Sequence, residues 1–133
     1  MLKTRKFAFA FFGWMAFVTW ASLSTFPEDD TPDINIPHFD KLVHFGFYFG
    51  AAVLATFFVR ETNHGKSPLL KTLVFVAFGA IIFGIIIEVL QYSFTYDRQG
   101  DPIDALANSC GAILGSMAMN WLFSRSKGLK WKN

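Results

Sequence analysis

The stretch EVLQYSFTYDRQGDPIDALAN, residues 88–108, joins the end of one apolar run to the beginning of another. It places polar groups at helical spacings, with Glu88 and Gln91 before the connection and Asp104 and Asn108 after it. Polar side chains within long apolar segments are costly in lipid, so they need partners inside the protein. The stretch therefore predicts two helices that turn back on each other and present polar side chains at the same membrane level.

The composition of the 133-residue chain is that of a membrane protein. Hydrophobic residues make up 53% of it, 17 residues are phenylalanine, and the mean hydropathy is +0.35. A soluble domain of this length seldom carries so much apolar surface, whereas a helix bundle in lipid can. The one cysteine, Cys110, excludes an internal disulfide, and its place in an apolar run indicates a small packing residue.

Four apolar segments follow one another, each close to the roughly 20 residues that a membrane-spanning helix needs. Because a backbone in lipid must satisfy its own hydrogen bonds, we expect these segments to be helices. The expected fold is an all-α membrane protein, an up-down antiparallel bundle of four transmembrane helices that forms a single domain over residues 1–133. The expected helices cover about residues 7–23, 42–59, 69–92 and 104–123.

The first segment has a second interpretation. A basic start, an apolar middle and small residues at Ala21 and Ser22 are also typical of a signal peptide. However, the segment is longer than the usual apolar region of about 7–15 residues. It also carries Trp14 and Trp20. These features favour a helix that stays in the mature protein.

Lysine and arginine are distributed unevenly between the connections. With a cytoplasmic N-terminus, Lys41 and Arg98 lie outside and ten of the 12 basic residues lie inside. Cytoplasmic segments of membrane proteins carry such an excess of Lys and Arg. The chain is therefore predicted to be a multi-pass protein of the cell (cytoplasmic) membrane with both termini in the cytoplasm. The ten inner residues are Lys3, Arg5, Lys6, Arg60, Lys66, Lys71, Arg125, Lys127, Lys130 and Lys132.

On the predicted outer face, three helices present polar side chains at one membrane level. Residues four apart share a helix face, which puts His44 and Tyr48 on the same side of their helix. Glu88 lies about 6 Å deeper than Tyr92, so we expect it to face the bundle and to be paired or protonated. The candidate binding residues are Asp40, Lys41, His44, Tyr48, Glu88, Gln91, Arg98, Asp101, Asp104 and Asn108.

Several of these residues also have purely structural interpretations. Asp101 followed by Pro102 is typical of a helix start, with the aspartate as N-cap and the proline in the first turn. Asn108 is typical of polar contacts between membrane helices, and His44 of a hydrogen-bonded interior histidine. Capping does not account for Glu88, which lies near the C-terminal end of its helix, where the helix dipole disfavours an anion.

Two glycine pairs predict where helices pack. Gly46 and Gly50 lie four residues apart in the second segment, and Gly111 and Gly115 do so in the fourth. Small residues at this spacing let the backbones of membrane helices approach closely. We therefore expect both pairs at helix contacts.

The polar blocks also carry a resemblance. The pattern is Asp40-Lys41-x-x-His44-Phe45-x-x-Tyr48, then Glu88-x-x-Gln91, then Arg98 and Asp101-x-x-Asp104-x-x-x-Asn108-x-x-Gly111-x-x-x-Gly115. It resembles the pattern of the VanZ-like family of bacterial membrane proteins. Three separated blocks agree in order and spacing over about residues 40–115, and the first segment carries no motif. The resemblance implies a small multi-pass, cell-envelope protein of the bacterial inner membrane, in a family related to the teicoplanin-resistance protein VanZ. It implies no particular biochemical activity.

Four functions are compatible with these observations. The first is a cell-envelope protein whose polar outer-face pocket binds a lipid headgroup, a glycolipid or a lipophilic antibiotic, with Lys41 and Arg98 meeting phosphate or carboxylate. The alternative is a membrane-embedded enzyme with a His/carboxylate site, metal-dependent or not, whose candidate catalytic residues are His44, Glu88 and Asp104. Proton or ion movement along the same groups is the third, and a purely structural role is the fourth.

The sequence predicts few partners beyond the membrane. It contains no nucleophile elbow, phosphate loop, HExxH or CxxC motif, so no motif supports an enzyme. We expect no cofactor and no tightly held metal, since an all-protein site without thiolates is also compatible with no metal. We expect membrane lipids, a lipid-linked or glycopeptide-type ligand and no nucleic acid as partners, and the oligomeric state stays open.

Overall fold

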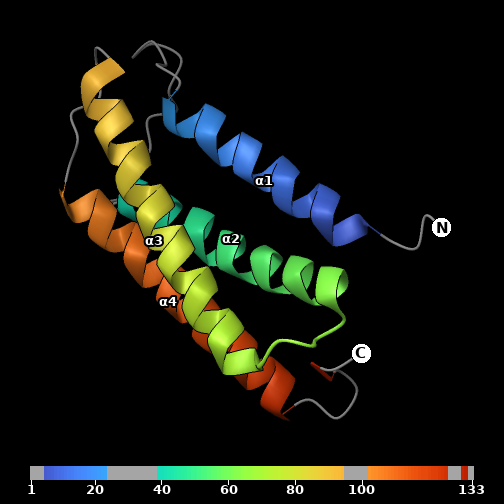
Figure 1. Ribbon diagram of the computed structural model, residues 1–133. Helices are drawn as coiled ribbons and strands as arrows, with labels where there is room; N and C mark the ends of the chain where they lie inside the picture. Colours follow the sequence, from blue (N-terminus) through green and yellow to red (C-terminus); the bar gives the residue numbers. More distant parts are fainter. Residues whose placement is uncertain (1–4, 24–38, 95–101, 126–129, 132–133) are drawn as a thin grey trace.

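The computed structural model describes residues 5–23, 39–94, 102–125 and 130–131, and its regular structure over these ranges is entirely α-helical. Four helices follow one another: α1 (Lys6–Leu23), α2 (Phe39–Asn63), α3 (Leu69–Phe94) and α4 (Pro102–Arg125). They alternate in direction and form one bundle, with α1 and α4 on opposite sides of it (Figure 1). The predicted all-α bundle is confirmed, and each helix covers its predicted segment.

Three of the four helices are long and apolar enough to cross a membrane: Lys6–Leu23, Lys41–Asn63 and Leu69–Ser93. The chain is therefore a multi-pass membrane protein. Helix α4 has 24 residues, about 36 Å of helix, but its sequence is more polar. Two of its polar side chains, Asn108 and Ser116, are buried against other helices, which leaves Met117 and Trp121 on its outside. That α4 also spans the membrane stays a prediction.

Burial in the bundle is the reverse of that in a soluble domain. Large apolar side chains such as Phe9 and Phe75 are 77% and 74% exposed. Polar side chains are among the most buried, with Asn108 at 1% and Glu88 at 8% exposure. A helix bundle in lipid has this distribution, because its exterior solvent is apolar and its polar groups must find partners inside.

The closest helix contact joins α2 and α4. A Cβ atom on Gly111 would overlap the carbonyl oxygen of Phe45, and one on Gly115 would lie 2.8 Å from the carbonyl oxygen of Phe49. The absence of side chains at Gly111 and Gly115 therefore lets the α4 backbone rest on the α2 backbone, as predicted.

The other glycine pair behaves differently from the expectation. A Cβ atom on Gly46 would meet nothing within 4 Å, so this residue is not at a helix contact. Gly50 does lie at a contact, but it accommodates the Trp14 ring of α1, which a Cβ would approach to 3.0 Å, rather than another backbone. The prediction for Gly46 is wrong because the contact face of α2 is turned away from it.

Helix α1 is attached to α2 along its length. The Trp14 indole Nε1–H donates a 2.9 Å hydrogen bond to the carbonyl oxygen of Phe47. At the start of α1, the Glu61 carboxylate accepts hydrogen bonds from the backbone N–H groups of Phe7, at 3.0 Å, and Ala8, at 3.4 Å. Glu61 thus caps the N-terminus of a different helix, where unpaired N–H groups and the helix dipole favour an anion.

Candidate functional site

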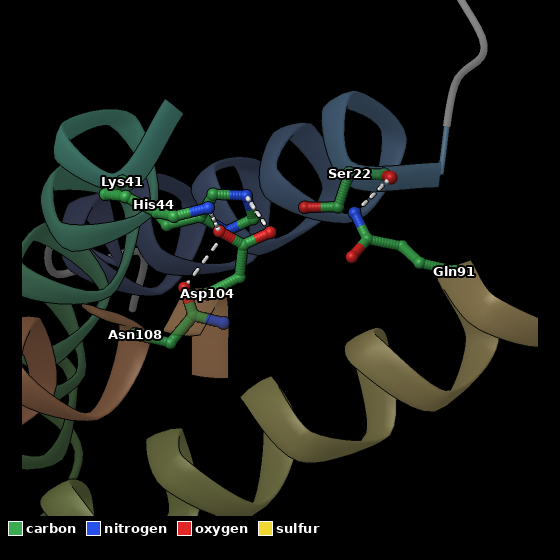
Figure 2. Close-up of polar contacts among 6 residues, drawn as sticks. All are labelled: Ser22, Lys41, His44, Gln91, Asp104 and Asn108. Atoms are coloured by element: carbon green, nitrogen blue, oxygen red, sulfur yellow. Dashed lines mark hydrogen bonds and ion pairs between the residues drawn. The ribbon is translucent and has the colours of Figure 1, made fainter. Parts of the chain in front are cut away.

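A cluster of polar side chains lies near the ends at which α2 and α4 begin and towards the C-terminal end of α3. We call it the polar cluster and define it as Lys41, His44, Glu88, Asp104 and Asn108. Figure 2 shows Lys41 and His44 reaching from α2 towards Asp104 and Asn108 on α4. The Lys41 Nζ atom lies 2.7 Å from Asp104 Oδ1, and His44 Nε2 lies 3.7 Å from Asp104 Oδ2.

Local helix geometry explains why these groups meet. Lys41 and His44 are three residues apart, and Asp104 and Asn108 are four apart, so each pair shares one face of its helix. The close α2–α4 contact at Gly111, less than one turn below Asn108, brings the two faces together. Asp104 lies in the first turn of α4, where the helix dipole stabilises a carboxylate.

The hydrogen bond between His44 and Asn108 defines the orientation of the imidazole. His44 Nδ1 lies 3.1 Å from Asn108 Oδ1. An amide oxygen only accepts hydrogen bonds, so Nδ1 carries the proton and donates it. The other ring nitrogen, Nε2, therefore faces Asp104, at a distance too long for a direct hydrogen bond.

Glu88 completes the polar cluster from α3. His44, Glu88 and Asp104 each have one atom that could bind a metal ion, and these three atoms lie within 4.8 Å of one another. Gly84, one turn before Glu88 on the same face, permits this approach: a Cβ there would lie 3.2 Å from the Tyr48 ring and 3.3 Å from Asn108. Three helices thus bring polar side chains together, and that these side chains form a binding site stays a prediction.

Tyr48 and Asn108 form the buried floor of the polar cluster. Each side chain is 1% exposed. Within the described part of the chain, the Tyr48 hydroxyl and the Asn108 Nδ2 group have no hydrogen-bond partner. A buried polar group without a partner costs about 1–3 kcal/mol, and such groups are typical of sites that receive a water, an ion or a ligand.

Gln91, another predicted site residue, has a different partner. Its Nε2 group donates a 2.6 Å hydrogen bond to the backbone carbonyl oxygen of Ser22, away from the other labelled side chains (Figure 2). The bond links α3 to the end of α1. Nothing in the sequence of the first segment marks Ser22 as a partner of Gln91, because the contact uses its backbone carbonyl oxygen.

Three further candidates have side chains outside the described residues: Asp40, Arg98 and Asp101. The predicted helix start next to Asp101 is confirmed, since α4 begins at Pro102. Within the described residues, the cation at Asp104 is Lys41.

These features define a multi-pass helical membrane protein that gathers an ion pair, a second acid and a histidine at one end of its bundle. The chain belongs to the VanZ/LLP1 family, whose model matches residues 3–123. The family resemblance is thus confirmed, and it extends to α1, where the sequence shows no motif. The comparisons with curated proteins and with solved structures found no match.

Proposed function

We propose that this protein binds the polar head of a membrane-embedded amphiphile at the polar cluster. The head carries a phosphate or carboxylate together with hydroxyl groups, as in a lipid headgroup, a glycolipid or a lipophilic antibiotic. The observation that carries the proposal is the Lys41–Asp104 ion pair at one end of a membrane-spanning bundle. Its side chains are 20% and 13% exposed, so a ligand can reach them.

The energetic cost of the polar cluster supports a role beyond packing. Charged side chains cost about 2.5–3.5 kcal/mol each at the centre of a membrane-spanning helix on insertion scales, and even near a helix end they need polar partners. The α2–α4 contact is already made by Gly111 and Gly115, without charged groups. A bundle that keeps Lys41, Asp104 and Glu88 in addition retains groups that packing does not require.

The chemistry of the exposed pair fits such a head. An ammonium can donate to several acceptors at once, so Lys41 can bridge Asp104 and a phosphate oxygen. The Asp104 carboxylate accepts hydrogen bonds from hydroxyl or amine groups. The exposed apolar surface of the helices lies in the same lipid as the tail of the amphiphile.

The proposal places the polar cluster at the outer face of the cytoplasmic membrane, with both termini in the cytoplasm. The distribution of Lys and Arg supports this orientation, since ten of the 12 then lie inside. The ligand would accordingly come from the outer leaflet or from the cell envelope.

A membrane-embedded enzyme is the second candidate. The grouping of His44, Glu88 and Asp104 within 4.8 Å favours it, because acid–base catalysis needs titratable groups within reach of one substrate. Incubating the purified protein with phosphatidylglycerol vesicles and analysing the lipids tests it. New lipid products that disappear in His44→Ala would favour the enzyme over simple binding.

Thermal unfolding of the full-length protein in detergent tests the binding proposal, with short-chain phosphatidylglycerol as the probe. This lipid supplies a phosphate and hydroxyls, and a ligand in 100-fold excess over its Kd stabilises the folded state by about 2.7 kcal/mol. We expect the probe to raise Tm by several degrees, and short-chain phosphatidylcholine to do so less.

Two variants show whether the effect belongs to the polar cluster. Lys41→Met should abolish the rise in Tm caused by phosphatidylglycerol, whatever its own Tm. Lys66→Met, which removes an exposed lysine at the opposite end of α2, should keep it. An equal rise in Lys41→Met and wild type would rule out binding at the polar cluster.

A further inference from the structure

His44, Glu88 and Asp104 have the composition of a metal-ligand set and lie close to one another. Each contributes one ligand atom, and these atoms lie within 4.8 Å of one another although they come from three helices. In a tetrahedral zinc site with bonds of about 2.1 Å, ligand atoms lie about 3.4 Å apart. The 3.7 Å between His44 Nε2 and Asp104 Oδ2 is close to that separation and too long for a hydrogen bond.

The imidazole of His44 is oriented as in a metal ligand. Because Nδ1 faces Asn108 Oδ1, Nε2 is the ring nitrogen directed towards the Asp104 carboxylate. An imidazole nitrogen and a carboxylate oxygen that face each other in this way can both bind one metal ion. Metal-bound histidines have this arrangement, in which the second ring N–H is held by an oxygen acceptor.

The surroundings supply the remaining features of a metal site. Lys41 pairs with Asp104 Oδ1, which leaves Oδ2 directed towards His44. The 1%-exposed Tyr48 and Asn108 side chains lie against Gly84, one turn from Glu88. Their hydroxyl and amide N–H groups have no partner within the described residues, so they are available to an ion-bound water or ligand.

We propose that His44, Glu88 and Asp104 bind one exchangeable divalent transition-metal ion of the zinc class, with a fourth position open. An imidazole nitrogen favours Zn²⁺ over Mg²⁺ or Ca²⁺, which require more oxygen ligands. The ion offsets the charges of two carboxylates inside the bundle. The proposal departs from the expectation of no metal, which rested on the absence of thiolates, and it does not depend on amphiphile binding.

The test uses tag-free, full-length protein in detergent, stripped with a chelator, and Zn²⁺ alone as the probe. Competition with a chromophoric chelator measures the stoichiometry and Kd. We expect one equivalent in the wild type and a loss of affinity of at least 100-fold in His44→Ala. His64→Ala, which removes an exposed histidine at the other end of α2, should bind like the wild type. Asn108→Ala should weaken binding 10- to 100-fold, because the imidazole loses its orienting partner.

Two further measurements keep the test decisive. Glu88→Gln is nearly isosteric with the wild type, so it should fold. Its expected loss of Zn²⁺ affinity can therefore be measured even if His44→Ala does not fold. In the wild type, one equivalent of Co²⁺ should give the visible absorption bands of a four- or five-coordinate site. Added Zn²⁺ should displace the Co²⁺ and abolish these bands. The proposal is wrong if the wild type binds no stoichiometric Zn²⁺, or if a folded His44→Ala or Glu88→Gln binds as the wild type does. No lipid is present, so this result is separate from the outcome of the phosphatidylglycerol experiment.

Discussion

At the residue scale, Asp104 is the centre of the polar cluster. Its two carboxylate oxygens face different groups, Lys41 at 2.7 Å and His44 at 3.7 Å. The Lys41–Asp104 pair is partly exposed, so its attraction is weaker than that of a fully buried pair. Removing one member still leaves an uncompensated charge near the membrane interior, and this asymmetry gives the pair a measurable coupling energy.

A double-mutant cycle measures that coupling. We expect Lys41→Met and Asp104→Asn each to reduce the free energy of unfolding by about 1–2 kcal/mol, a value discounted for partial exposure. The double variant should lose less than the sum, because neither charge is then left alone. The measurement is reversible unfolding in detergent, followed by circular dichroism. Strictly additive losses would show that the ion pair does not couple the two helices.

At the element scale, the contact between α2 and α4 determines the site. Gly111 and Gly115 bring the α4 backbone against Phe45 and Phe49, and the same contact sets the distance between His44 and Asn108. Helix packing and site geometry are therefore not independent. A change that separates the two helices should loosen the polar cluster as well as the bundle.

Substitution of Gly111 tests this link. In Gly111→Ala, the new Cβ would overlap the backbone of Phe45, which cannot move aside as a side chain can. We expect a loss of about 1–3 kcal/mol in the free energy of unfolding, the usual cost of overpacking. Affinity for Zn²⁺ should fall with it, because His44 and Asp104 move apart.

Gly46→Ala is the matched control for this experiment. It makes the same chemical change in α2, where a Cβ meets nothing within 4 Å. Alanine is favoured over glycine within a helix by roughly 0.5–1 kcal/mol, so this variant should be neutral or slightly more stable. Similar losses in both variants would indicate that glycine flexibility matters, rather than the close contact at Gly111.

At the scale of the whole molecule, the described residues place many large apolar side chains on the outside of the bundle and several polar side chains inside it. This arrangement suits a bundle surrounded by lipid, and the uneven distribution of Lys and Arg predicts its orientation. The polar cluster and the Glu61 cap of α1 lie towards opposite ends of α2, which begins at Phe39 and ends at Asn63. The orientation therefore decides which of these two ends is outside.

Cysteine labelling in intact cells tests the orientation. In a Cys110→Ser background, single cysteines at Asp30 and Gln99 should react with an impermeant thiol reagent added from outside. A cysteine at Lys66 should react only after the membrane is permeabilised. The background substitution is needed because Cys110 is an exposed free thiol. Labelling of Lys66→Cys alone in intact cells would reverse the predicted topology.

The sequence by itself determined the helices and their order. The length of an apolar run is a local property, and lipid leaves such a run little choice but to become a helix. It also determined that His44, Glu88 and Asp104 share one membrane level. Each lies only a few residues from the helix end on the same side of the bundle, and the rise per residue converts that number into a depth. The glycine spacing predicted the close approach at Gly111 and Gly115, but the same spacing was misleading for Gly46.

Only the tertiary structure decided which side chains meet. It pairs Asp104 with Lys41, sends Gln91 to Ser22 on α1, turns Gly46 away from every neighbour, and uses Glu61 to cap another helix. These outcomes depend on how each helix is rotated about its axis. In a soluble protein a continuous apolar stripe reveals that rotation. In lipid most residues on both faces are apolar, so only the few polar residues mark the inner face, and they do not specify which partner each one meets.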